Sequence, residues 1–80
     1  MATEFKLEHP IKSTDGSEIS TLKVRRPRVK DIEIMEEETT QLGKSIRLLS
    51  LVAAISEDDI RSMDAKDFNT VSEAVAGFLY

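Results

Sequence analysis

The residues that could do chemistry in this sequence are its only histidine, His9, and two carboxylate pairs, Asp58/Asp59 and Asp64/Asp67. A histidine can transfer protons or bind a metal ion, and paired carboxylates can act as acid and base or bind a hard cation. A metal site needs several ligands, and the sequence offers His9 no second histidine and no cysteine. A calcium loop would need ligands alternating around a central glycine, which neither pair shows. We therefore predict a half-buried His9 in a strand, and aspartates that serve as helix caps.

Composition and motifs exclude several classes of function. The sequence contains no Ser/His/Asp set, glycine-rich phosphate loop or metal-ligand spacing, so we predict no catalytic residue, no metal and no other cofactor. Without cysteine there is no disulfide framework. A net charge of −4 disfavours a general nucleic-acid binder, because phosphate contacts need a basic surface. The first residues lack the basic start and apolar run of a signal peptide, and the apolar segments fall short of the roughly 20 residues that span a bilayer. We expect a cytoplasmic protein without membrane contact.

Two segments of alternating apolar and polar residues predict a β-hairpin over residues 4–26. Residues 5–9 and residues 20–25 each show the period of two that is typical of a strand with one buried face. Between them lies Asp15-Gly16, a preferred pair for a two-residue hairpin turn. Such a hairpin is marginal alone, so we expect its apolar face to pack against helices.

The turn also predicts a register for the hairpin. If Asp15-Gly16 is the whole loop, Leu7 faces Val24 and His9 faces Leu22. Leu7, Val24 and Leu22 then share one face of the sheet, as a buried face requires.

Residues 41–55 are the central element of the predicted fold. From Ile46 to Ile55 only Arg47 and Ser50 are polar, which indicates a helix that is buried on most sides. Apolar spacing and capping residues predict three more helices, over residues 29–38, 57–62 and 65–79. Asp31 lies in the first turn or at the cap of the first of them. The prediction is thus one α+β domain over residues 1–80, an N-terminal β-hairpin packed on a small bundle of three to four helices with a central buried helix.

A basic cluster lies at the end of the second strand, and an acidic run follows it. The basic residues are Lys23, Arg25, Arg26, Arg28 and Lys30, and five acidic residues come between Asp31 and Glu38. Equal numbers of opposite charges favour a solvated surface that compensates itself, and no aromatic residues interleave the cluster to stack on bases. A docking surface for an acidic protein segment is the alternative, because complementary charge steers association.

Three segments in their order give the chain a family resemblance: residues 7–11 (LEHPI), residues 22–31 (LKVRRPRVKD) and residues 60–79 (IRSMDAKDFNTVSEAVAGFL). The chain resembles the small tail assembly chaperones of contractile-tailed, Mu-like phages and prophages. Met63 stands where leucine is usual in the family, a swap of similar volume. Arg28 stands where a small capping residue is more typical, which leaves the start of the first helix open.

The resemblance implies a task without catalysis. Such proteins bind the long, aggregation-prone tape measure protein in the host cytoplasm before the tail tube polymerises around it. Tube subunits then displace them, so they are absent from the finished virion. Many are also made in a longer, frameshifted form, and such a form of this chain is a further candidate partner. The alternatives are a structural or adaptor subunit that stays in an assembly, a nucleic-acid-associated protein and an antitoxin-like module. The sequence does not determine the oligomeric state.

We place the partner-binding site of this sequence in a groove between the basic cluster and the apolar ends of helices. The groove would be rimmed by Arg25, Arg26 and Arg28, and Ile32, Met35, Phe78 and Leu79 would supply the apolar contacts. Replacing Arg25 and Arg26 with glutamate should weaken client binding and leave folding intact.

Overall fold

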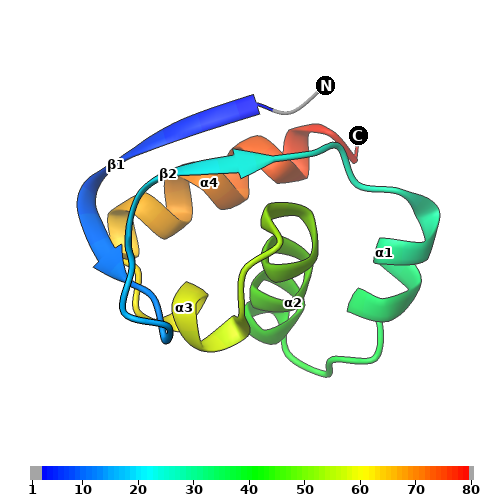
Figure 1. The fold of residues 1–80 in the computed structure, drawn as a ribbon. Coiled ribbons are helices and arrows are strands. Elements are labelled where there is room, and N and C mark those ends of the chain that lie inside the picture. The colour runs from blue at the N-terminus through cyan, green and yellow to red at the C-terminus, as the bar shows by residue number, and fades with distance from the viewer. Residues whose placement is uncertain (1–2, 80) are drawn as a thin grey trace.

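The computed structural model describes residues 3–79 as an antiparallel two-stranded hairpin followed by four helices (Figure 1). The prediction of an α+β fold with an N-terminal hairpin and a small helical bundle is confirmed. The elements are β1 (Thr3–Lys12), β2 (Glu18–Val24), α1 (Val29–Met35), α2 (Gln41–Ala53), α3 (Glu57–Arg61) and α4 (Ala65–Gly77).

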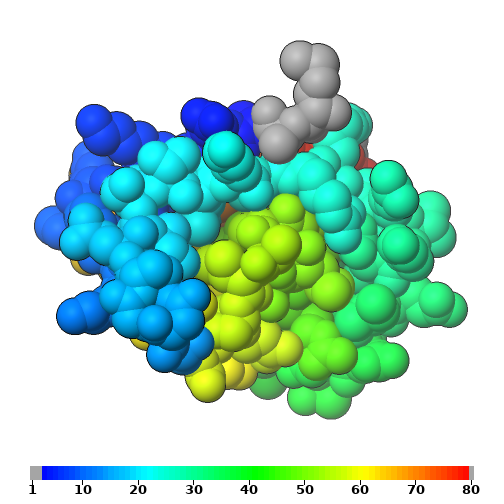
Figure 2. Space-filling model, viewed as in Figure 1, coloured from blue at the N-terminus to red at the C-terminus, as the bar shows by residue number. Residues whose placement is uncertain are grey.

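Helix α2 is the centre of the packing, because it contacts α1, α3, α4 and β2. The hairpin lies across one side of the bundle, and α4 runs beneath it in contact with β1 (Figure 1). The space-filling view shows the hairpin, α1, α2 and α3 forming a continuous surface that nearly hides α4 (Figure 2). Both strands, α2, α3 and α4 contribute to one apolar core, and α1 packs the partly buried Met35 against it. The core consists of Leu7, Ile11, Leu22, Val24, Leu48, Leu49, Val52, Ile60, Met63, Val71 and Val75.

The hairpin has a different register from the predicted one. Leu22 pairs with Phe5 instead of His9, and Val24 pairs with Thr3 instead of Leu7. Both partners thus lie four residues earlier in β1 than predicted. Nearer the turn, Ile11 pairs with Ile19. The two ends of the ladder are thus in different registers, which the assumption of a regular two-residue hairpin did not allow.

A bulge in β1 and a longer loop explain this difference. Residues 7–10 of β1 lie opposite Ser20 alone, so the strand carries three extra residues there. The loop spans residues 13–17, and within it Gly16 takes a φ of 91° that favours glycine. The predicted Asp-Gly pair therefore lies in the turn, but as part of a five-residue loop.

The bulge also changes the environment of His9. The prediction of a half-buried ring beside Leu22 is wrong, because His9 lies in the bulge and is exposed. Pro10 follows His9 in the bulge. Because the residues of the bulge are not paired in the ladder, the missing N–H of Pro10 costs no ladder hydrogen bond.

Local caps begin the helices where the sequence indicates. Thr40 accepts a hydrogen bond from the Gly43 N–H, Ser56 accepts one from the Asp59 N–H, and Asp64 accepts from Lys66 and Asp67. The helix ends come earlier than predicted: α1 ends at Met35, α2 at Ala53 and α4 at Gly77. For α2 the reason is a left-handed turn at Ala54, whose φ is 57°.

Replacing Ala54 with glycine should therefore stabilise the protein. The Cβ of an L-residue costs about 1–2 kcal/mol in the left-handed region, and glycine avoids that cost at the expense of some chain entropy. We expect the free energy of unfolding to rise by about 0.5–1 kcal/mol, measured by urea denaturation. Ala53→Gly, one position earlier and inside the helix, should lower it instead.

Candidate protein-binding site

Three buried aspartates fix the hairpin and its connection to the helices. Asp31, Asp59 and Asp67 are 1%, 4% and 6% exposed. Their carboxylates accept hydrogen bonds from the segment before α1, from the hairpin loop and from β1, respectively. Burying a carboxylate costs free energy unless hydrogen-bond donors reach its oxygens. Each aspartate therefore favours the one arrangement in which its donors, in the hairpin or in the linker before α1, lie against it.

Asp67 holds the bulge of β1. Its Oδ1 accepts from the Glu8 N–H at 3.2 Å, and its Oδ2 accepts from the His9 N–H at 2.9 Å. These are amides that the interrupted ladder leaves without strand partners. The prediction that capping explains Asp67 is therefore wrong, and Asp64 alone caps α4.

Asp59 holds the hairpin loop in the same way. Its Oδ2 accepts from the Ser13 Oγ–H at 3.0 Å, and its Oδ1 accepts from the Thr14 N–H at 3.1 Å. Its carboxylate thus makes long-range contacts, and a capping role does not account for it.

Asp31 joins the end of β2 to the first turn of α1. Arg25 donates two hydrogen bonds to its carboxylate, at 2.7 and 2.9 Å, and the Arg28 N–H donates a third at 2.7 Å. The Arg25 guanidinium, helped by the Arg28 N–H, lowers the pKa of Asp31 from 3.8 to about 2, against the opposing effect of burial. Arg28 has no acceptor in its side chain, so only Asp31 closes the capping interaction at the start of α1.

This ion pair corrects one expectation about the predicted groove. Arg25 supports the fold by neutralising a buried carboxylate, so its replacement with glutamate would place two negative charges together. A variant that carries Arg25→Glu therefore cannot separate partner binding from folding.

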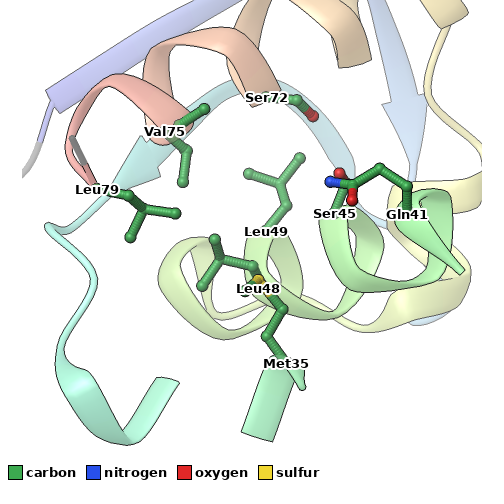
Figure 3. Close-up of a pocket in the computed structure, with 9 residues that line it drawn as sticks. Met35, Gln41, Ser45, Leu48, Leu49, Ser72, Val75 and Leu79 are labelled. Atoms are coloured by element: carbon green, nitrogen blue, oxygen red, sulfur yellow. The ribbon is translucent and has the colours of Figure 1, made fainter. Parts of the chain in front are cut away.

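Four of the other predicted site residues form two groups near the end of α4. The Arg26 guanidinium lies over the Phe78 ring, 5.1 Å from its centroid. Met35 of α1 and Leu79, two residues beyond α4, line a pocket of about 100 Å³ against α2 (Figure 3). The close-up shows Met35 next to Leu48, with Val75 and Leu79 on the opposite wall.

The pocket between α1, α2 and α4 also has a polar side. Gln41, Ser45 and Ser72 line it, and Ser72 Oγ is buried without a hydrogen-bond partner among residues 3–79. Of the remaining predicted residues, Arg28 is exposed at the start of α1, and Ile32 is half-buried on that helix.

A larger apolar groove lies between α2, α3 and α4, and sequence reasoning missed it. Its cavity volume is about 310 Å³, and its lining is apolar except for one arginine: Leu42, Ile46, Ile60, Arg61, Met63, Ala65 and Phe68. A signal was present in Leu42, which lies four residues before Ile46 on the same helix face. Leu42 is 62% exposed, and with Val29 at 82% it is one of the two exposed large apolar residues of the described chain.

The described residues give no geometry for metal chemistry. Within residues 3–79, no group of three His, Cys, Asp or Glu side chains is placed to hold a metal ion. None of the helices in this part of the chain has the length and apolar character needed to cross a bilayer. What the structure offers is apolar concave surface with charged edges, which is a geometry for binding protein segments.

The chain was also compared with known protein families, curated proteins and solved structures. The family described as "Phage tail assembly chaperone proteins, E, or 41 or 14" matches residues 4–80. No curated protein and no solved structure is significantly similar to the chain. Because the family match covers nearly the whole sequence, the chain belongs to the phage tail assembly chaperone family.

Proposed function

We propose that this protein binds the tape measure protein of its phage, keeps it soluble and helps recruit tail tube subunits to it. It acts without catalysis in the cytoplasm of the bacterial host, as one domain, and is absent from the finished virion. The family match over residues 4–80 carries the proposal. The exposed apolar surface supports it, because a protein that holds an aggregation-prone helix must offer such surface before the partner arrives.

We place the first contact with the tape measure protein at the pocket between α1, α2 and α4. Met35 and Leu79 supply apolar lining, and the Arg26–Phe78 pair lies at the same end of α4. Arg28, two residues after Arg26, is exposed and adds positive charge at the start of α1. Arg25 contributes indirectly, since its ion pair with Asp31 fixes the segment that carries Arg26 and Arg28.

Co-expression with the tape measure protein tests the proposed function. We expect the tape measure protein to become soluble and to co-purify with this chain, and tail tube protein added afterwards to displace the chain. A tape measure protein that stays insoluble would contradict the proposal. Recovery of this chain in mature particles would support a permanent structural or adaptor subunit instead.

A charge reversal at Arg26 and Arg28 tests the proposed contact. The double variant Arg26→Glu/Arg28→Glu should reduce co-purification of the tape measure protein by about five-fold or more, since charge complementarity at a rim governs association. Arg26→Glu removes a cation–π contact worth about 0.5–1 kcal/mol at an exposed site, so the far-ultraviolet circular dichroism spectrum should stay that of the wild type.

The matched control reverses the same number of charges elsewhere. Lys6→Glu/Lys66→Glu changes two exposed lysines, one on β1 and one on α4, that lie outside the basic cluster, and it should leave co-purification unchanged. An equal loss in both double variants would mean that only net charge matters, and this contact would be ruled out.

A further inference from the structure

The apolar groove between α2, α3 and α4 has walls of a defined character. Leu42 and Ile46 form one wall, one turn apart on α2, and Phe68 of α4 forms the other. Ile60 and Met63 are buried and close the floor. An apolar groove lined by neighbouring helices can accept the apolar stripe of another helix, whose side chains also recur at every turn.

Helices α3 and α4, which form two sides of this groove, lie in an acidic part of the chain. Residues 56–80 contain six acidic and two basic side chains, whereas residues 1–55 contain nine of each, so the whole net charge of −4 lies in residues 56–80. Asp59 and Asp67 are held by hydroxyl and amide donors, which do not cancel their charge. The segment that carries α3 and α4 thus has an excess of four negative charges, whereas the α2 wall of the groove carries Lys44 and Arg47.

Two of these carboxylates lie at the edge of the groove itself. Arg61, the one charged residue in the lining, donates to Asp58 Oδ1 and to Glu57 Oε1, both at 3.2 Å. Glu57 also pairs with Arg47, which contacts Glu37 and Glu38 as well, so four carboxylates share two guanidinium groups and leave a local excess of negative charge. Asp58 is exposed to an incoming cation. This rim is opposite in sign to the basic segment at Arg26 and Arg28.

We propose that this groove is a second binding site, which takes a basic amphipathic helix of a partner protein. The apolar stripe of that helix would lie between Leu42 and Phe68, and its lysine or arginine side chains would reach Glu57 and Asp58. The acidic rim selects against an acidic helix, since like charges across an interface are costly. This second site adds to the proposed function the kind of segment that is bound. It rests on the proposed function only for the assumption that the chain binds other proteins.

Two synthetic peptides test the site without the tape measure protein, so the site and the proposed function can fail separately. Both carry leucines on one helical face, with lysines on the other face in one peptide and glutamates in its counterpart. Fluorescence anisotropy with the wild-type protein should show at least about ten-fold tighter binding of the lysine peptide, and added salt should reduce that preference.

Matched variants locate the binding in the groove. Leu42→Ser should weaken binding of the lysine peptide by about ten-fold, because it removes the exposed half of the α2 wall. Val29→Ser changes an even more exposed residue outside the groove and should have no effect. Asp58→Asn should weaken it by about two- to three-fold, and Glu33→Gln on α1 should not.

Other results would overturn the proposal. Equal binding of the two peptides, binding of neither, or equal effects of Leu42→Ser and Val29→Ser would remove the site. Sedimentation of the protein alone provides the last discriminating measurement. A dimer that Leu42→Ser dissociates would show that a second copy of the chain, and not a basic helix, occupies the groove.

Discussion

Asp31→Asn is expected to lower the free energy of unfolding by about 2–3 kcal/mol, because the amide cannot keep a charge-assisted, bidentate pair with Arg25. Asparagine would also present N–H groups where Arg25 and the Arg28 N–H already donate. Such a loss is a large part of the stability of an 80-residue domain, about 4–12 kcal/mol. Urea denaturation should show a lower midpoint with an unchanged slope.

The same carboxylate makes stability depend on pH in a defined window. The pKa of Asp31 falls from 3.8 to about 2 on folding, so its contribution is complete above pH 3.8 and is lost as the pH falls through 2. The stability difference between the wild type and Asp31→Asn should therefore shrink across that window. The control is Glu33→Gln on the same helix, which should change stability by less than about 0.5 kcal/mol. An Asp31→Asn variant as stable as the wild type at neutral pH would mean that the ion pair does not hold α1 to β2.

Asp67→Ala is expected to destabilise the protein by about 2–4 kcal/mol, because two backbone N–H groups lose their acceptor at once. The effect should be local in origin, since Asp67 is the residue that fastens the bulge of β1 to α4. Hydrogen exchange provides a residue-specific measurement: the amides of Glu8 and His9 should exchange much faster in the variant, before the core amides of α2 do.

Two further variants separate this role from general effects of charge on α4. Glu73→Gln removes an exposed carboxylate of the same helix and should leave stability and the Glu8 and His9 amides unchanged. Asp67→Asn retains one acceptor oxygen and should recover part of the loss. If the two amides stay protected in Asp67→Ala, the bulge is held by strand pairing and core packing, and Asp67 only adds charge.

Much of the fold follows from signals within a few residues of the chain. Ser56 and Asp64 begin helices because their side-chain oxygens reach N–H groups two or three residues ahead, and Gly16 permits the turn of the hairpin. The apolar run from Ile46 predicts the central helix, because only a helix surrounded by other elements can bury so many faces. The apolar spacing that predicts the last helix did not reveal that its Phe68 lines a groove.

What the tertiary structure alone decided are the contacts between distant residues. The register of the hairpin depends on the bulge, and Asp67 holds the bulge from 58 and 59 positions away in the sequence. Asp59 reaches the loop across 45 positions. A period or a capping pattern describes only neighbours within one or two turns, so the sequence indicated aspartates at helix starts and could not show where their carboxylates point. For the same reason the exposure of Leu42 appears only when α2, α3 and α4 are packed, because burial is set by which surfaces meet and not by how apolar a residue is.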